Sequence, residues 1–455
     1  PGGICISATV YEQVRNSFTE SYEDLGEQSL KNIAHPVRVY RMGPGTDGNT
    51  TESARYTVPG FGGRPAIAVL PFDNLSGDSE QEYFADGIVE DLITRLSTWR
   101  LFPVIARNST FVYKGKSTDV KKVSRELGVR YVVEGSVRRA GDRVRITAQL
   151  IDATTGHHVW AERYDRELRD IFALQDEITQ TIVAALEPAL DKVERRRAVR
   201  QDPKSLDAWD CIQRGWWHID QVSREDNAKA KALFQRAIEI DPHFSNAHSA
   251  LATSYLYEVL SQWTDNPLQS ITQALQSAEK SVALSSEDPS GHTVLGMACT
   301  VAGQFERGVA EQERAVELNP SSARNYWGLG QALANSGRPQ EAIAMLEKAI
   351  RLSPNDPRLQ VFLFHLAFAH FLLGRYKETI ELGKKSLKLR PDQSYVHRIL
   401  AACYGHLGQA EEGEAALKEA FRIFPGFSIE KSRLVNPPAF IDRLVAGWRQ
   451  CGWKG

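Results

Sequence analysis

Residues 326–354, with the sequence YWGLGQALANSGRPQEAIAMLEKAIRLSP, decide the fold of the larger part of the chain. Apolar side chains recur there at helical spacing in two runs, and Gly330 and Ala342 are small enough to lie where two helices cross closely. Pro354 ends the second run, because proline cannot continue a helix. The stretch therefore predicts a pair of packed helices.

The same pattern recurs along the chain after Pro203. The distance from Pro320 to Pro354, from Pro357 to Pro391 and from Pro391 to Pro425 is 34 residues each time. A small residue lies 24 positions before a terminal proline at Gly296, Gly330, Ala367 and Ala401. The 34-residue period, the small residues and the prolines that end each unit together resemble the tetratricopeptide repeat. About six units fit into residues 201–427, the first two of them irregular, and they predict an α-solenoid.

Before the repeats, the pattern alternates between strands and helices. Residues 66–70 (AIAVL) are typical of a strand covered on both faces, and residues 104–106 predict a second strand. Residues 131–137 and 143–152 alternate as an antiparallel hairpin with one wet face. A third strand over residues 158–164 and a long helix over residues 171–197, broken or kinked at Pro188, complete a small mixed α/β domain spanning residues 65–200.

The predicted fold class is therefore multidomain, with α/β parts followed by an all-α part. Residues 43–64 contain too little apolar surface to offset their ordering entropy, so they predict a flexible linker. Residues 428–455 predict a helix that caps the array.

Composition and charge exclude several classes of protein. Lys and Arg number 55 against 57 Asp and Glu, a net charge of -2, so no chain-wide basic field favours nucleic acid. The longest apolar run, residues 361–373, is interrupted by His365 and His370 and is too short for a membrane span. Five scattered cysteines favour a reducing compartment, and we expect a cytoplasmic protein.

Two further segments resemble known families. Residues 1–7 (PGGICIS), 22–27 (YEDLGE) and 36–41 (PVRVYR) are similar to the tail of a class III adenylate/guanylate cyclase domain, so residues 1–42 are identified as its remnant. Residues 70–72 (LPF), 83–87 (YFADG) and 153–156 (ATTG) resemble the TolB amino-terminal-like domain. In this order, the chain resembles a fragment, the carboxy-terminal part of a bacterial adenylate cyclase with a TolB-like domain and tetratricopeptide repeats.

The resemblance implies cyclic AMP signalling without catalysis by this chain. Class III cyclases need two aspartates that hold metal ions, because the ions activate the 3′-hydroxyl and neutralise the triphosphate. In the family these residues, and an Asn and Arg that steady the transition state, lie upstream of the GGICIS stretch. We therefore assign no catalytic or metal-binding residue and no cofactor to this chain. Mg²⁺ or Mn²⁺ is expected only at the absent cyclase site.

Three functions remain open at this point. The first is a regulatory, protein-interaction portion that acts on an upstream cyclase domain. The second is an active adenylate cyclase, when the missing amino-terminal catalytic residues are present. The third is the effector half of a transcription regulator, because similar TolB-like–tetratricopeptide halves can follow a DNA-binding domain.

A candidate binding groove comes from the repeat numbering. In tetratricopeptide units, positions 2, 5, 9 and 12 of the first helix line the concave groove, where a protein or peptide partner binds. These positions are Arg324, Trp327 and Gln331 in the fourth unit and Val361, Phe364, Phe368 and Phe371 in the fifth.

The apolar stripe predicts either a partner-binding surface or a surface covered by the chain itself. The amphipathic segment 437–448, with Phe440, Leu444 and Trp448 spaced by four, is the candidate cover. For a half-covered position, Phe368→Ala is expected to cost much less than a core substitution.

Other polar clusters have plainer interpretations. The loop Asp73, Asn74, Ser76, Gly77 and Asp78 follows an apolar strand, where ligands bind in α/β sheets, although turn chemistry explains the same residues. His157 and His158 point to opposite faces of a strand, so they do not share a metal ion. The basic run 195–197 predicts a solvated helix end.

Overall fold

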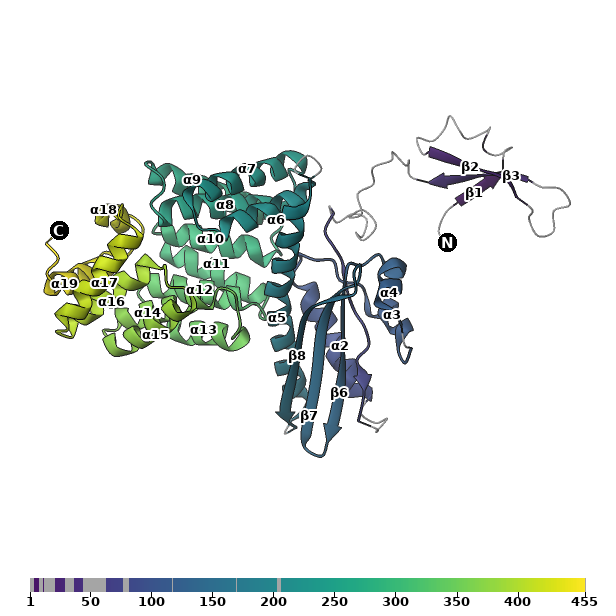
Figure 1. The fold of residues 1–455 in the computed structure, drawn as a ribbon, viewed down its shortest axis with the longest axis horizontal. Coiled ribbons are helices and arrows are strands. Elements are labelled where there is room, and N and C mark those ends of the chain that lie inside the picture. Colours follow the sequence, from purple (N-terminus) through teal and green to yellow (C-terminus); the bar gives the residue numbers. More distant parts are fainter. Residues whose placement is uncertain are drawn as a thin grey trace. The chain divides into compact units, whose positions relative to one another are not determined.

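The computed structural model describes residues 4–7, 11, 21–28, 37–43, 63–76, 82–116, 118–168, 170–202 and 206–454. The chain forms two compact units, Pro1–Tyr56 and Thr57–Gly455. In the first unit, strands β1 (Ile4–Ser7), β3 (Val37–Gly43) and β2 (Ser21–Gln28) form an antiparallel sheet in that order (Figure 1). The likeness of this unit to a cyclase domain stays a prediction.

The second unit begins with a mixed sheet. Its strands follow the order β4 (Ile67–Val69), β6 (Tyr131–Ala140), β7 (Arg143–Asp152) and β8 (His157–Glu167), and β5 (Asp73–Asn74) also pairs with β6. Strands β4 and β5 lie parallel to β6, whereas β6, β7 and β8 are antiparallel. Burial alternates along β7, with Val144 and Ile146 inside and Arg143 and Arg145 outside. The small mixed α/β fold and its half-wet hairpin are as the sequence predicts.

Helices cover both faces of this sheet. Helices α2 (Glu82–Ser97) and α5 (Ile171–Arg200) pack on one face, and α4 (Val120–Leu127) packs on the other, where Val123 meets Val132. The short α3 (Arg107–Thr110) and η3 (Phe111–Tyr113) lie between α2 and α4 in the chain. Helix α4 begins at the cap Asp119, whose carboxylate accepts a hydrogen bond from the Lys121 backbone N–H, and it ends at Gly128 in the left-handed conformation.

The structure differs from the sequence-based prediction at two places. The strand expected at residues 104–106 is reduced to one bridge between Ile67 and Val104, because the chain enters α3 at Arg107. The sequence predicts a break or a kink at Pro188; α5 is not broken there and spans 30 residues in all, Ile171–Arg200. An interior proline costs about 3 kcal/mol. Burial of Leu186 and Leu190 on either side offsets this cost, because each buried leucine contributes about 1.5–3 kcal/mol.

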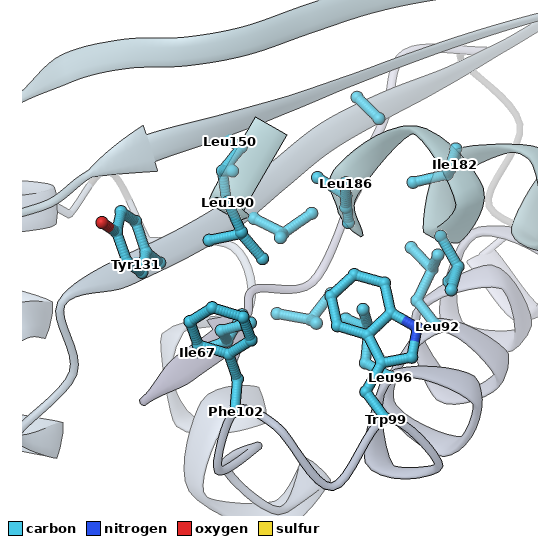
Figure 2. Packing of buried hydrophobic residues seen from close by; sticks show 14 of the residues in the cluster. Ile67, Leu92, Leu96, Trp99, Phe102, Tyr131, Leu150, Ile182, Leu186 and Leu190 are labelled. Atoms are coloured by element: carbon cyan, nitrogen blue, oxygen red, sulfur yellow. The ribbon is translucent and has the colours of Figure 1, made fainter. Parts of the chain in front are cut away.

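The hydrophobic core of the α/β part continues into the first helices of the array. Figure 2 shows Ile67, Tyr131 and Leu150 of the sheet, Leu92 and Leu96 of α2, and Ile182, Leu186 and Leu190 of α5 meeting around Trp99 and Phe102. The Phe102 ring packs edge-on against Trp209 of the array, with ring centroids 5.4 Å apart. The core is therefore continuous across the boundary between residues 200 and 201.

Within residues 206–454 the chain forms six pairs of helices followed by two more helices (Figure 1). The pairs are α6 (Ala208–Ile219) with α7 (Arg224–Ile240), α8 (Ser245–Leu260) with α9 (Pro267–Leu284), α10 (Pro289–Val301) with α11 (Phe305–Leu318), α12 (Ala323–Asn335) with α13 (Pro339–Leu352), α14 (Leu359–Leu372) with α15 (Tyr376–Leu389), and α16 (Ser394–His406) with α17 (Ala410–Ile423). Helices α18 (Ile429–Arg433) and α19 (Pro438–Gln450) end the chain.

Small residues act in the array as the spacing predicts. A Cβ at Gly330 would lie 2.5 Å from Leu346 Cγ, so α12 and α13 cross there without room for a side chain. The turns within the last four pairs each contain a glycine at positive φ: Gly303, Gly337, Gly374 and Gly408. Only glycine adopts this backbone without strain, so these residues fix the helix–turn–helix geometry.

Candidate functional site

The predicted groove residues lie on α12 and α14, and segments of the same chain cover most of them. Helix α5 covers the α12 end, where Ala184 joins the hydrophobic cluster that contains Trp327. Helix α19 covers the α14 end, where Phe440 packs on Phe368 and Phe371. The sequence left partner binding and self-coverage open for this surface, and the structure places the chain's own helices on it.

Helix α5 is held on the array by charge as well as by packing. The Asp191 carboxylate lies 3.1 Å from the Arg324 guanidinium and 3.0 Å from that of Arg195, which also contacts Asp220 at 2.7 Å. Burial alone would raise the pKa of Asp191, but Arg195 and Arg324 lower it below its ordinary value. Gln180 adds a hydrogen bond from its Nε2 to the Pro320 carbonyl at 2.6 Å. Asp191 is therefore an ionised link between the α/β part and the array.

Helix α19 lies against α16 through contacts that leave no room for larger side chains. A Cβ at Gly447 would lie 2.4 Å from the Ala402 carbonyl oxygen, and a Cβ at Gly405 would lie 2.0 Å from the Gly447 carbonyl oxygen. Trp448 is fully buried and donates from Nε1 to the Arg398 carbonyl at 2.8 Å. Arg443 donates to the carbonyls of Phe371 and Leu372 at the end of α14. These contacts fix α19 across the first helices of the last two units.

This cover changes the expectation for Phe368. The Phe368 side chain is 4% exposed, and its ring meets Phe440 edge-on with centroids 4.7 Å apart. Phe371 is fully buried, whereas Phe364 is half-buried against Tyr395 at 4.5 Å. Phe368 is therefore packed as a core residue, and the small cost expected for Phe368→Ala does not fit this structure.

The remaining groove residues lie between the two covers. Trp327 is 8% exposed and donates from Nε1 to His365 Nδ1 at 3.0 Å. Burial lowers the pKa of His365 to about 4, so the ring is neutral, and its Nδ1 also lies 2.9 Å from the Val361 carbonyl oxygen. Val361 and Gln331 are half-buried, and Val361 lines a cavity of about 410 Å³ between α5 and the array.

Sequence reasoning missed the residues of α5 that complete this site. The basic run 195–197 was expected to be solvated, but Arg195 and Arg197 keep only 12% and 15% of their side-chain surface exposed. Arg197 contacts Glu194 at 3.0 Å and Asp210 at 2.8 Å, and Tyr131 also donates to Glu194 at 2.5 Å. The acidic residues at spacings of three and four from these arginines indicated ion pairs within α5, but not that the pairs are buried.

The described residues of the candidate ligand loop hold the loop in place, and its role in ligand binding stays a prediction. Ser76 N–H donates to Asn74 Oδ1 at 3.0 Å, and Arg139 N–H donates to Ser76 Oγ at 2.9 Å, so these side chains hold the loop on β6. Asp73 lines a cavity of about 720 Å³ together with Lys116 and Glu134. Gly77 and Asp78 lie outside the described residues.

The described residues were also searched for metal sites and for helices that could span a membrane. No group of three or more His, Cys, Asp or Glu side chains there is arranged to hold a metal ion. No helix among the described residues is both long and apolar enough to cross a membrane.

The comparisons agree with the geometry of the array. A family model for the tetratricopeptide repeat matches residues 271–357, and a model for subunit 3 of the anaphase-promoting complex, or cyclosome, matches residues 340–420. A third model, the second domain of the HilA/YgeH-like transcriptional regulator, matches residues 63–181. The helical array within residues 206–454 is thus a tetratricopeptide protein-interaction domain. The TolB-like assignment of the α/β domain stays a prediction.

A curated relative is similar to this chain over much of its length. "Putative adenylate cyclase 3" of Rhizobium meliloti (strain 1021) is 45% identical over 299 residues, which cover 66% of this chain and 51% of the relative. The chain thus spans about half the length of the curated relative that it matches.

Solved structures resemble the array more distantly. They include the APC/C hetero-tetramer Cut9–Hcn1 (19% identity, 59% of this chain and 48% of that chain, TM-score 0.42). They also include a monomeric IFIT1 mutant with Gppp-AAAA (17% identity, 55% and 58%, TM-score 0.43) and Pseudomonas aeruginosa pilF (19% identity, 52% and 96%, TM-score 0.35).

Proposed function

We propose that the chain is the regulatory, protein-interaction portion of an adenylate cyclase-like signalling protein, whose catalytic residues lie outside it. The relative named as an adenylate cyclase and the tetratricopeptide domain support this function. The observation that carries it is the double role of α5. Ile182 and Leu186 of this helix lie in the α/β core, while Asp191 pairs with Arg324 in the groove.

The shared helix supplies a physical route for a signal. A protein or peptide that binds the concave face competes with α5 or α19 for the same surface. Displacing α5 exposes apolar surface of the α/β core. The α/β domain is therefore less stable when a partner occupies the groove than when the groove is free. The α/β domain then passes this difference to the upstream cyclase domain. The proposed setting is the cytoplasm, where the buried thiols of Cys211, Cys299, Cys403 and Cys451 stay reduced.

The test is a cyclic AMP assay on the complete product of the gene that encodes this chain. We expect it to form cyclic AMP from ATP with Mg²⁺ or Mn²⁺, and we expect residues 1–455 alone to form none above a blank without protein. Arg324→Gln should change the rate of the complete product, because it loosens α5, whereas Arg314→Gln should not. Arg314 is a matched control on the exposed side of α11, where it pairs with Glu317. Absence of cyclic AMP from the complete product with either metal would refute the cyclase assignment.

A second candidate function is the effector half of a transcription regulator. It is favoured by the match of residues 63–181 to the second domain of a HilA/YgeH-like regulator. Chromatin immunoprecipitation of the complete product distinguishes the two functions. Enrichment of particular promoters, together with no cyclic AMP formation, would favour the regulator.

A further inference from the structure

The cavity of about 410 Å³ between α5 and the array has the size of a small-molecule site. Its walls come from α5, from the turn after α6, from α8, and from α12 and the start of α14. Small-molecule pockets in proteins span about 300–1,000 Å³. The cavity therefore has room for a small molecule, but not for a folded domain.

The cavity is richer in positive than in negative charge. Six cationic side chains line it: Lys192, Arg195, Arg196, Arg324, Arg358 and Arg390. Four acidic side chains line it: Glu187, Asp191, Asp220 and Asp356. Of these acids, Asp191 is shared by Arg195 and Arg324, and Asp220 binds Arg195 again. The carboxylates are thus concentrated on two of the arginines.

Arg358 forms no ion pair of its own among the described residues. Its half-buried guanidinium interacts electrostatically with Asp220 and Asp191, but both of these carboxylates are already paired with Arg195. Burial lowers the pKa of Arg358, and the positive charge of Arg324 lowers it further. The Asp356 carboxylate accepts a hydrogen bond from the Arg358 backbone N–H at 2.8 Å and not from its guanidinium. A desolvated guanidinium beside other guanidinium groups is unfavourable, and a bound anion would offset this cost.

Aromatic side chains line the same cavity. Trp217 and Tyr257 are half-buried there, and Trp327 forms part of the wall. Flat aromatic faces bind planar rings and the delocalised cations beside them. The cavity thus combines groups that recognise an anion with groups that recognise a ring.

We propose that this cavity binds a phosphorylated small molecule that carries a planar ring, such as a nucleoside monophosphate. Arg358 contacts the phosphate, Arg195 and Arg324 flank it, and the aromatic wall contacts the ring. Phosphate suits this set because its oxygens accept two parallel hydrogen bonds from a guanidinium fork and carry more than one charge. This site does not depend on the proposed function, because binding is measured without cyclase activity.

Isothermal titration calorimetry on residues 1–455 tests the proposal, with AMP, inorganic phosphate and adenosine as probes at low ionic strength. We expect AMP to bind at least tenfold tighter than phosphate or adenosine. Arg358→Gln should weaken AMP binding at least tenfold, and Arg358→Lys should weaken it less because the charge remains. The matched control is Arg351→Gln, at an exposed arginine of α13 whose nearest carboxylate, Glu347, is 3.9 Å away.

Three outcomes would overturn the proposal. The first is no heat with AMP or phosphate in the wild-type chain. The second is AMP binding that Arg358→Gln leaves unchanged while the melting temperature is also unchanged. The third is an acidic peptide that binds through Arg358 at least tenfold tighter than AMP, which would make the site a peptide site. If Arg358→Gln does not fold, Arg358→Lys is compared with Arg351→Lys. Arg358→Lys should weaken AMP binding and Arg351→Lys should not, and equal AMP affinity of the two variants would overturn the proposal.

Discussion

Phe368→Ala is expected to destabilise the array as a core substitution does. The side chain is 4% exposed, and its ring lies 4.7 Å from that of Phe440 and 6.4 Å from that of Phe364. Removing a buried phenylalanine side chain costs about 3–5 kcal/mol, because transfer free energy is lost and a cavity remains. Helix α19 is anchored by Trp448 and Gly447 and cannot collapse freely into the gap. We therefore expect a loss of about 3–4 kcal/mol.

The assay is urea unfolding followed by helical circular dichroism, with a double-mutant cycle. Phe440→Ala is the partner variant, and the edge-on ring pair predicts a coupling of about 0.5–1.5 kcal/mol between the two substitutions. Leu389→Ala is the control, since Leu389 is 54% exposed in the same unit and should change stability by less than about 0.5 kcal/mol. A loss below about 1 kcal/mol for Phe368→Ala, with no coupling to Phe440, would show that α19 does not cover the groove.

Three further predictions concern the two covers and the groove residues between them. Gly447→Val should cost about 1–3 kcal/mol in urea unfolding, because its Cβ would meet the Ala402 backbone, whereas Val at the exposed Ala446 should be tolerated. The pKa of His365 in the folded chain is about 4, below its ordinary value of 6.5. The stability that the neutral ring contributes is therefore complete above pH 6.5 and is lost as the pH falls. Between pH 7 and pH 5 the wild type should lose about 2 kcal/mol more than His365→Gln, and an equal loss would contradict the neutral ring. Arg324→Gln should lower stability by about 1 kcal/mol at low salt, after allowing for its partial exposure, and Arg314→Gln should not; equal melting of both would contradict the Asp191 link.

Features that depend on neighbouring residues were predictable from the sequence. The helix pairs follow from a period of apolar and small residues, and Gly330 shows why a small side chain is required where α12 crosses α13. The hairpin of β6 and β7 follows from the alternation along β7, since one residue of slip would expose Ile146 and bury Arg145. In each case the deciding contacts lie within one supersecondary unit.

Contacts between distant segments were not predictable in the same way. Arg324 and Asp191 are 133 residues apart, and no periodic pattern relates α5 to the fourth unit. The charges of α5 favour a solvated helix end when they are read alone, because exposed and buried ion pairs have the same sequence spacing. Which of them are buried is decided by tertiary packing, as it is for Arg197 between Glu194 and Asp210.

The two covers have a common consequence for any partner of the groove. Helix α19 offers Phe440, Leu444 and Trp448 on one face, all less than 10% exposed, so its apolar residues are already bound within the chain. A segment tethered to its own site competes at an effective concentration in the millimolar range for short flexible linkers. Because α19 competes for the groove, the apparent affinity of a partner helix for the covered chain is lower than its affinity for the uncovered groove. Deleting residues 437–455 should raise the apparent affinity of a partner for the α14 face, while leaving the α5 face covered as before.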